Sequence, residues 1–411
     1  MLAYVLNKHG KPLMPCGPRK ARLLLKEGKA KVVYRVPFTI QLLYGSSGYR
    51  QPIYCGRDPG LTQGVGAIRG DGRILFLAEV TGRKDISELI YQRRCLRRSR
   101  RHRKTRYRKP RFDNRRRSEG WLPPSVAHLL YEHQKVRRLV ESILPVTAWA
   151  DEINRFDTHR MWNPGVSSRG YQEGPLKGKF DVREYVLERD SYWCVLCGSP
   201  EKREVHHIIW RFRGGSNRPR NLVTLCGDFH SKVTSGEIPL SAIVESYRWP
   251  ARLNAINKRF LEGGSVSVPA YRVKRAREEL GLDKTHASDA LAVICSAFHL
   301  KPDFLEMPPV YRGRFVRREN RQLHRANPAK GGKRPRANAN RYLMNKHGVR
   351  LTKYDLVEYR NGDRRLIGYI NTLRSSGTAR VSNWQGRELA NVSVNQLKKL
   401  QNADTLIWEV D

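Results

Sequence analysis

Acidic side chains are scarce in this sequence. The 411 residues include 38 Asp and Glu against 79 Lys and Arg, for a net charge of +41. This imbalance exceeds what solubility requires, and it indicates a polyanionic partner such as nucleic acid. Because 39% of the residues are still hydrophobic, we expect folded domains, two or three by length, and not a disordered basic tail.

Long hydrophobic runs are also absent. No apolar stretch approaches the ~18 residues needed to cross a bilayer, and the first residues, MLAYVLNKHGK, lack the apolar core of a signal peptide. The seven cysteines form no disulfide-like array, which fits a reducing compartment. We therefore expect a soluble intracellular protein with no membrane partner.

Metal-ligating side chains are concentrated in residues 190–231, DSYWCVLCGSPEKREVHHIIWRFRGGSNRPRNLVTLCGDFHS. A metal site that cleaves phosphodiesters needs one imidazole to deprotonate water, and ligands that hold a cation against the phosphate. We predict His207 as the base and His206 and His230 as the ligands. Asn221 would orient the base by hydrogen-bonding nearby backbone.

The pattern HH-x13-N-x4-C-x3-H resembles the HNH nuclease signature, whose fold is a β-hairpin laid on a helix around one magnesium ion. A structural zinc knuckle with incidental histidines is the alternative. Cys194, Cys197 and Cys226 suggest a second, structural zinc. HNH domains with zinc usually place a fourth ligand just before the final His, where this chain has Phe229. Either another residue completes the set, or the subdomain folds without zinc.

Residues 1–50 indicate a small α/β unit, with strands AYVLN, AKVVYRV and FTIQLLY and a helix KARLLLKEG that ends at Gly28. Pro12 and Pro15 bracket a stiff extended segment, for which a plain turn is the alternative. The run GKPLMPCGPRKARLLLKEGKAKVV resembles the module, named for its Pro-Leu-Met-Pro run, that opens the IscB proteins. These are transposon-associated nucleases related to the type II CRISPR effectors.

Three further segments carry acids on predicted strands or helices. PIYCGRDPG is a strand with Asp58 at its end, and VGAIRGDGRILFLAEV follows as a hairpin that turns at Asp71-Gly72. VTAWADEINRF predicts a strand with paired acids. DKTHASDALAVICSAF predicts an apolar helix whose His286 and Asp289 share one face.

A strand-borne Asp followed by a meander is how RNase H-like folds begin. The IscB resemblance implies that Asp58, Glu152 and Asp289 form a RuvC-like site for two magnesium ions, with His286 beside them. Asp151 is the alternative to Glu152, and a turn residue is the alternative for Asp58 taken alone.

Residues 93–117, RRCLRRSRRHRKTRYRKPRFDNRRR, hold 15 Lys or Arg among 25 residues. Nothing breaks a helix from Asp85 to about Tyr107, and Pro110 stops it. Because like charges at this density repel, we expect phosphates to order the helix; a disordered basic arm is the alternative. The segment resembles the arginine-rich bridge helix of IscB and CRISPR nucleases. The implied RNA contacts are Arg93, Arg94, Arg97, Arg98, Arg100, Arg101 and Arg103.

The stretch between the basic helix and the HNH segment combines an apolar helix, VAHLLYEHQKVRRLVESIL, with a Gly-rich linker, RGYQEGPLKGK. Residues 317–341 form a basic connector of low complexity. Residues 342–411 then alternate strands, DLVEYR, RLIGYINTL, GTARVSN and TLIWEV, with turns at Asn361-Gly362 and Ser376-Gly377. We predict a small β-barrel.

By position this barrel resembles the domain that contacts the short DNA motif beside the target; an RNA-binding or purely structural barrel is the alternative. Side chains that can read base edges gather in ARVSNWQGR, with Trp384 as packing or stacking support. The candidates are Arg380, Asn383, Gln385 and Arg387.

We therefore predict a multidomain α/β protein with a split RNase H-like domain, an inserted ββα-metal domain, an N-terminal α/β module and a C-terminal β-barrel. The boundaries are 1–50 for the Pro-Leu-Met-Pro module, 51–84, 119–178 and 247–325 for the RuvC-like parts, 85–118 for the bridge helix, 179–246 for the HNH domain, and 326–411 for the linker and barrel.

The resemblance implies an RNA-guided DNA endonuclease in which a structured guide RNA pairs with one strand of double-stranded target DNA. The protein would be monomeric in a ribonucleoprotein, in the nucleoid-associated cytoplasm of a bacterium or archaeon. The cofactors would be Mg²⁺ at both sites, a candidate Zn²⁺, and the guide. The chain lacks a large helical lobe, so structured RNA must supply much of the guide's support. Two alternatives remain: a protein-only HNH endonuclease, and a non-catalytic RNA-binding protein.

Overall fold

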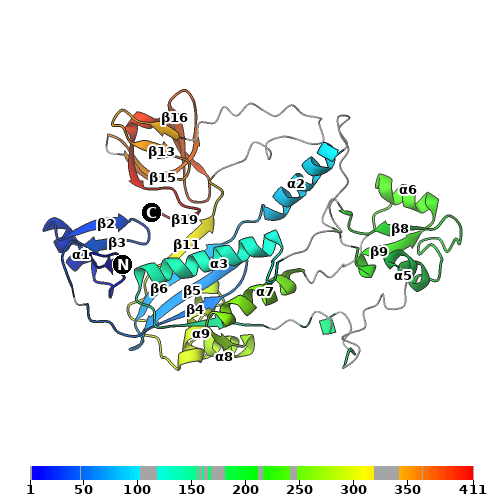
Figure 1. Cartoon of the computed structure of the whole chain (residues 1–411), viewed down its shortest axis with the longest axis horizontal. Coiled ribbons are helices and arrows are strands. Elements are labelled where there is room, and N and C mark those ends of the chain that lie inside the picture. Colours follow the sequence, from blue (N-terminus) through cyan, green and yellow to red (C-terminus); the bar gives the residue numbers. More distant parts are fainter. Residues whose placement is uncertain are drawn as a thin grey trace. The chain divides into compact units, whose positions relative to one another are not determined.

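A computed structural model divides the chain into two compact units (Figure 1). The first joins Met1–Asn154 to Ala255–Asp411, and the second, Arg155–Asn254, is inserted between them. The structure describes residues 2–46, 48–101, 118–154, 157, 160–161, 165–167, 181–211, 215, 217–240, 248–318, 342–362 and 364–410. The predicted Gly-rich linker and most of the predicted connector lie outside these residues. None of the described helices is long and apolar enough to cross a membrane.

The first fifty residues form the predicted small sheet with one helix. The strands pair in the order β1-β3-β2. Gly28, with a φ of +66°, follows the helix in the left-handed conformation that glycine favours. The Tyr4 hydroxyl donates to the Leu75 carbonyl at 2.9 Å and so ties this module to the large sheet. The elements are β1 Tyr4–Leu6, α1 Pro18–Lys26, β2 Ala30–Tyr34 and β3 Thr39–Leu42.

A seven-stranded sheet in the order β10-β7-β4-β5-β6-β11-β19 is the centre of the first unit. β4, β5 and β6 form the predicted antiparallel meander, which turns at Asp71-Gly72. β7 runs parallel to β4, β10 parallel to β7, and β11 parallel to β6. Because β7 precedes the inserted unit and β10 follows it, the sheet closes across the insertion. The strands are β4 Ile53–Asp58, β5 Thr62–Arg69, β6 Ile74–Thr81, β7 Ala148–Glu152, β10 Val266–Val268, β11 Val310–Phe315 and β19 Leu406–Trp408.

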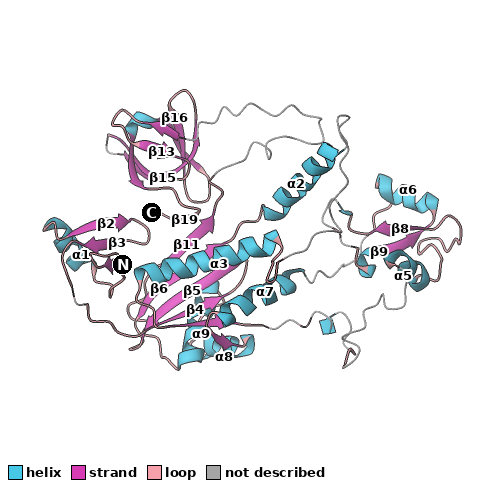
Figure 2. Cartoon of the chain, in the orientation of Figure 1, coloured by secondary structure: helices cyan, strands magenta, loops and turns pink. Residues whose placement is uncertain are grey.

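Helices cover both faces of this sheet (Figure 2). Side chains alternate along β4, so Ile53 and Cys55 pack with apolar residues of α3, whereas Tyr54 packs with those of α9. Val136 and Val140 of α3 are fully buried, as the predicted apolar face requires. The bounds are α3 Pro124–Ile143, α7 Arg248–Glu262, α8 Ala270–Glu279 and α9 His286–Phe298.

The predicted arginine-rich helix is present as α2, Ile86–Arg101. It begins close to the predicted Asp85. Residues 102–117, which include Arg103, lie outside the described residues, as do the side chains of Arg100 and Arg101.

The C-terminal residues form a strand pair, β12-β13, and a five-stranded antiparallel sheet in the order β17-β16-β15-β14-β18. The turns at Asn361-Gly362 and Ser376-Gly377 join hairpins as predicted. The bounds are β12 Tyr342–Met344, β13 Arg350–Thr352, β14 Leu356–Asn361, β15 Arg364–Leu373, β16 Thr378–Ser382, β17 Glu388–Ser393, a 3₁₀ helix Val394–Gln396 and β18 Leu397–Gln401.

One predicted strand belongs to a different sheet. TLIWEV forms β19, which pairs antiparallel with β11 at the edge of the seven-stranded sheet. The prediction that this strand belongs to the barrel is wrong. Leu406, Ile407 and Trp408 are all buried, so the strand needs apolar residues against both of its faces. Leu406 and Trp408 enter the core of the large sheet, and Ile407 packs with residues of the C-terminal sheet.

The inserted unit contains the predicted β-hairpin and helix. β8 and β9 pair antiparallel, and α6 follows with Cys226 at its N-cap. Asp181 caps the preceding helix by accepting from the Glu184 amide at 2.8 Å. The bounds are α5 Val182–Arg189, β8 Glu204–His207, a 3₁₀ helix Pro219–Asn221, β9 Leu222–Leu225 and α6 Gly227–Ser235.

Candidate active sites

The first candidate site lies at the edge of the seven-stranded sheet where β4 and β7 end. Asp58 is the last residue of β4, and Glu152 is the last residue of β7. These strands are parallel neighbours with Arg57 opposite Asp151, so the next residue of each strand leaves the sheet at the same edge and on the same face. The beginning of α9 reaches this edge as well.

Two glycines determine how closely α9 approaches. A Cβ at Gly64 would lie 1.8 Å from the His286 carbonyl oxygen, and a Cβ at Gly56 would lie 2.4 Å from the Ala290 carbonyl oxygen. Both distances are far below van der Waals contact, so any larger residue would push the helix off the sheet. The glycines of β4 and β5 therefore set the distance from α9 to Asp58.

This close approach brings Asp58, Glu152, His286 and Asp289 near enough for their charges to act on one another, and we call this group the network. His286 Nδ1 lies 2.6 Å from Asp58 Oδ2, and Arg277 donates to Asp289 Oδ1 at 2.5 Å. The hydrogen bond with Asp58 raises the pKa of His286, although burial opposes this. Burial, followed by the charges of Asp58 and Asp289, raises the pKa of Glu152 to about 7. Carboxylates crowded in this way fit divalent cations such as Mg²⁺, which prefer oxygen ligands.

Asp151, the alternative to Glu152, faces away from this network. It is fully buried, and its Oδ1 accepts from Arg57 Nε at 2.5 Å. Arg57 also contacts His133 Nδ1 at 2.8 Å and lies 3.6 Å from the ring centre of Phe260. Burial, and then the Arg57 charge, lower the pKa of His133 well below its ordinary value. Side-chain alternation along β7 thus places Glu152 with the carboxylates and Asp151 in a buried ion pair on the other face.

Several contacts of the network were not predicted from sequence. Arg277 comes from α8, and Glu79 of β6 accepts from the Ala287 amide at 3.2 Å. Neither residue belongs to a motif, and only the fold brings them close. Asn154 donates to Glu152 Oε1 at 3.1 Å. Because the two residues are only two positions apart, this contact could have been predicted from the local sequence.

The second candidate site lies in the inserted unit, on β8 and α6. His206 and His207 are the last two residues of β8. His206 is 7% exposed, and its ring centre lies 4.9 Å from that of His230. His230 Nδ1 lies 3.2 Å from a carboxylate oxygen of Glu204, a partner that was not predicted. The structure thus brings the two predicted metal ligands together.

Two polar side chains contact the ring of His207, the predicted base. Its Nε2 accepts from Arg211 Nε at 3.1 Å and lies 3.0 Å from Asn217 Oδ1. The Asn221 side chain accepts from the Ile209 amide at 2.8 Å and donates to the Ile209 carbonyl at 3.0 Å. This is the backbone contact predicted for Asn221, and it fixes the chain just after His207.

His206 carries the clearest indication of a bound cation. Its Nε2 is buried and has no hydrogen-bond partner in the part of the chain that the structure describes. Burial, and then the neighbouring His230 and His207, lower the pKa of His206 and so favour its neutral ring. A buried polar atom without a partner is costly, and neutral imidazole is a common metal ligand. His206 and His230 therefore fit a divalent cation.

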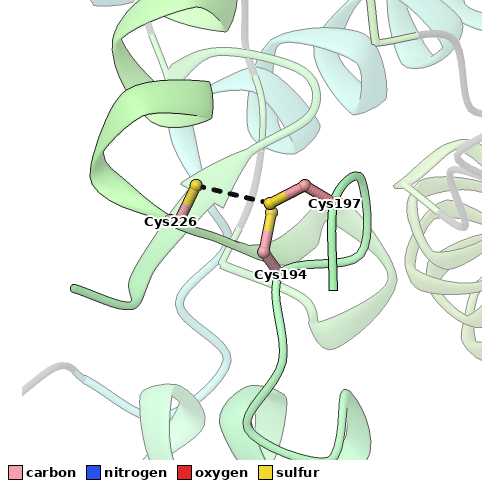
Figure 3. Close-up of side chains that lie close together, drawn as sticks. All are labelled: Cys194, Cys197 and Cys226. Atoms are coloured by element: carbon pink, nitrogen blue, oxygen red, sulfur yellow. Dashed lines mark hydrogen bonds between the residues drawn. The ribbon is translucent and has the colours of Figure 1, made fainter. Parts of the chain in front are cut away.

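A third group, the predicted zinc ligands, is shown in Figure 3. The sulfurs of Cys194, Cys197 and Cys226 all lie within 4.8 Å of one another, and those of Cys197 and Cys226 are 3.7 Å apart. Among the described residues, no other three His, Cys, Asp or Glu side chains come this close. Burial raises the pKa of Cys194, but backbone hydrogen bonds, from Cys226 first, outweigh it and lower the pKa to about 7.

Three thiol groups at this spacing fit zinc. Phe229, at the position where a fourth ligand was expected, packs against the apolar cluster that contains Cys194 and Cys226. The described residues therefore supply three of the four ligands that a closed tetrahedral site needs.

The two groups of predicted nucleic-acid contacts differ in how their side chains are held. Arg93, Arg94, Arg97 and Arg98 of α2 are exposed. In the candidate DNA-reading turn, Arg380 pairs with Glu388 at 2.7 Å. Asn383 Oδ1 accepts from the Arg387 amide at 2.9 Å and so closes the turn. Trp384 donates to Glu409 at 3.1 Å and packs against the cluster that contains Tyr369 and Ile407. The side chains of Gln385 and Arg387 are exposed.

Comparison with known proteins finds two family matches. Residues 3–174 match the family described as RRXRR protein, and residues 194–236 match the HNH endonuclease family. The second match spans the three thiols and the predicted base, ligands and Asn221.

Two curated proteins are similar over short segments. One is a probable HNH endonuclease of Lactococcus phage SK1, 42% identical over 62 residues, which cover 13% of this chain and 66% of the phage protein. The other is anaredoxin of Nostoc sp. (strain PCC 7120), 33% identical over 60 residues, which cover 14% of this chain and 79% of that protein. An RRXRR region followed by an HNH endonuclease domain identifies the chain as a member of the IscB-like proteins, with a metal-dependent HNH nuclease domain.

Proposed function

We propose that the chain is an RNA-guided endonuclease that cuts both strands of matching double-stranded DNA. The HNH site would cut the strand paired to the guide. The site of Asp58, Glu152 and Asp289, here called the carboxylate site, would cut the displaced strand. One observation carries this proposal. Asp58, Glu152 and Asp289 converge at one sheet edge of a chain that already has an HNH domain.

The sheet supports a RuvC-like assignment for the carboxylate site. A meander whose first strand ends in an acid, followed by parallel strands, is the arrangement that the resemblance implies. Segments 51–84, 119–178 and 247–325 all contribute strands to this sheet, as a domain split by insertions would require.

The residues present indicate how each site would work. Asp58, Glu152 and Asp289 would hold two Mg²⁺ ions, and His206 with His230 would hold one. Bound cations of this kind stabilise the charge that develops on the attacking and leaving oxygens. His207 would take a proton from the attacking water at the HNH site, with Asn221 fixing the chain beside it. His286, whose Nδ1 lies 2.6 Å from Asp58 Oδ2, would transfer a proton at the other site.

The charge distribution supports a guide RNA. The net charge of +41 is ample for backbone contacts to RNA and DNA, and α2 presents a run of exposed arginines. Base pairing would then supply most of the sequence information, and the C-terminal sheet would contact the motif beside the target. Gln385 and Arg387 are the two candidates there whose side chains are exposed.

Strand-specific cleavage tests the proposal. The protein is purified with its RNA, the RNA is sequenced, and a DNA with the matching site is labelled separately on each strand. We expect wild type to cut both strands, His207→Ala to leave the guide-paired strand intact, and Asp58→Ala to leave the displaced strand intact. His9→Ala and Asp283→Ala, at exposed positions outside both sites, are the matched controls.

Other results would refute parts of the proposal. Equal cutting after RNase treatment would favour a protein-only HNH endonuclease. Tight RNA binding without Mg²⁺-dependent cutting would favour a non-catalytic RNA-binding protein. A variant that still cuts both strands at the wild-type rate would remove its residue from the proposed role.

A further inference from the structure

A continuous groove in the first unit is not used by either candidate site. Two cavities, of about 390 and 540 Å³, share Arg83, Phe315, Val316 and Arg317 in their walls. Each volume falls in the range of about 300–1,000 Å³ typical of pockets that hold one small ligand. We call this pair of cavities the interdomain groove because its remaining walls come from the segment before α2, from α3, from β11 and from the C-terminal sheet. All of these elements belong to one compact unit.

The lining combines an apolar floor with cationic walls. Phe315 and Val316 are each 6% exposed and form the floor. One carboxylate, Asp85, faces six cationic side chains among the lining residues. These are Arg83, Lys84, Arg314, Arg317, Arg318 and Lys353. A single-stranded nucleotide binds where its base can lie on an apolar surface and its phosphate can contact cations.

Arg83 and Arg314 are held in place by hydrogen bonds within the protein. Arg83 Nε and Nη2 donate to the two oxygens of Asp85 at 2.9 and 2.7 Å, and Nη1 lies 3.3 Å from His128 Nε2. Arg314 Nε donates to the Trp384 carbonyl. Because these guanidinium groups are already ordered, a ligand would lose less side-chain entropy on binding them.

Tyr354 is the third feature of the groove. Its φ is +69°, a conformation that costs energy for a residue other than glycine. Its neighbour Asp355 holds it there, by accepting from the amides of Thr352 and Ala403, both at 2.7 Å. The Lys353 ammonium lies 4.8 Å from the Tyr354 ring centre. The fold thus maintains a strained aromatic residue and a cation together on this wall.

We infer that the interdomain groove binds two consecutive unpaired nucleotides of the guide RNA, with bases on the apolar and aromatic surfaces and phosphates on the cationic walls. This inference rests on the proposed function. RNA is favoured over DNA for two reasons. Arg83 to Asp85 lead directly into α2, the helix proposed to hold the guide. His128, Asp85 and Thr405 in the lining are also suitable partners for a 2′-hydroxyl.

Cross-linking of the full chain with its copurified RNA and target DNA tests the inference at the site itself. After ultraviolet irradiation, mass spectrometry identifies the peptides joined to each strand. We expect RNA joined to peptides that contain Tyr354 or Trp384, together with RNA joined to α2. Cross-links to α2 without any at the groove would overturn this inference and leave the proposed function intact. Absence of RNA from the purified protein would overturn both, and cross-links from the groove to DNA alone would overturn the assignment to RNA.

Tyr354→Gly gives a second test, because glycine adopts a φ of +69° without strain. The ring that it removes also packs against the cluster of Val316, Leu356, Tyr369 and Ile407, so the melting temperature of the variant is measured beside its affinity. Loss of one stacked base should weaken guide-RNA affinity by roughly 5- to 150-fold. Tyr271→Ala, which removes an exposed ring from α8, is the control and should have no effect. Lys353→Gln should lower the slope of log affinity against log salt by about 0.7. Lys346→Gln, an exposed lysine outside the lining, is its control. Wild-type affinity in Tyr354→Gly and an unchanged slope in Lys353→Gln would refute the inference.

Discussion

The buried ion pair between Arg57 and Asp151 should respond very differently to one substitution and to two. The two side chains are 1% and 0% exposed, so neither charge is stabilised by water. Asp151→Ala leaves the Arg57 cation buried without its partner. Breaking a buried pair in this way costs about 3–5 kcal/mol in the free energy of unfolding.

Replacing both residues removes the uncompensated charge. Arg57 Nη2 and Asp151 Oδ2 have no partner among the described residues, so the native pair is itself incompletely satisfied. By itself, the combination of Arg57→Met and Asp151→Leu should leave the free energy of unfolding nearly unchanged. However, His133 Nδ1 then loses its contact with Arg57. An unsatisfied buried nitrogen costs about 1–3 kcal/mol. We therefore expect the double variant to recover roughly half of the loss seen in Asp151→Ala.

Urea denaturation of the full chain, followed by circular dichroism, measures these differences. Asp71→Ala is the control because Asp71 pairs with Arg69 at the surface, where its side chain is 50% exposed. A surface pair contributes about 0–1 kcal/mol. If Asp151→Ala lowers the free energy of unfolding no more than Asp71→Ala does, the Arg57–Asp151 pair contributes no more than a surface pair. If the double variant is less stable than Asp151→Ala, the cost does not arise from an unpaired charge.

Three further predictions concern protons, zinc and salt. Because the pKa of Glu152 is raised from 4.5 to about 7 in the folded protein, this carboxyl should stabilise the metal-free fold less as the pH rises from about 4.5 through 7. Melting temperatures should show that slope in wild type and lose it in Glu152→Gln. Phe229→Cys should increase the zinc content and the resistance to chelators, measured by elemental analysis, and unchanged content would remove position 229 from the zinc site. Arg97→Gln with Arg98→Gln should reduce the salt slope of RNA binding by about 0.7–0.9 per lost phosphate contact, and an unchanged slope would leave both side chains in solvent.

Local patterns were sufficient to predict most elements of the fold. Turn residues such as Asp71-Gly72 and Ser376-Gly377 mark their hairpins, and the apolar periodicity of α3 matches its buried face. The strand TLIWEV was assigned to the wrong sheet because its pairing partner, β11, is about ninety residues earlier in the chain. A run of buried residues indicates that a strand is covered on both faces, but not which sheet covers it.

The candidate sites divide in the same way. The imidazoles and Asn221 lie within one short motif, so their grouping was visible in sequence. In the carboxylate site, the choice between Asp151 and Glu152 depends on which face of β7 each side chain leaves. Asp151 faces Arg57, and only the structure shows this. Arg277 and Glu79 could not be predicted, because their roles follow from where α8 and β6 lie and not from any spacing.

The position of the inserted unit has a thermodynamic consequence. Parallel neighbours such as β7 and β10 need a crossover of at least a dozen residues in any case, and here the crossover contains about 110. The entropy of closing a loop grows only with the logarithm of its length, so this roughly tenfold lengthening costs about 2 kcal/mol. Such a cost is comparable to that of a single unfavourable point mutation. A sheet of this kind can therefore gain, lose or exchange an HNH unit at this connection with little change in its own stability.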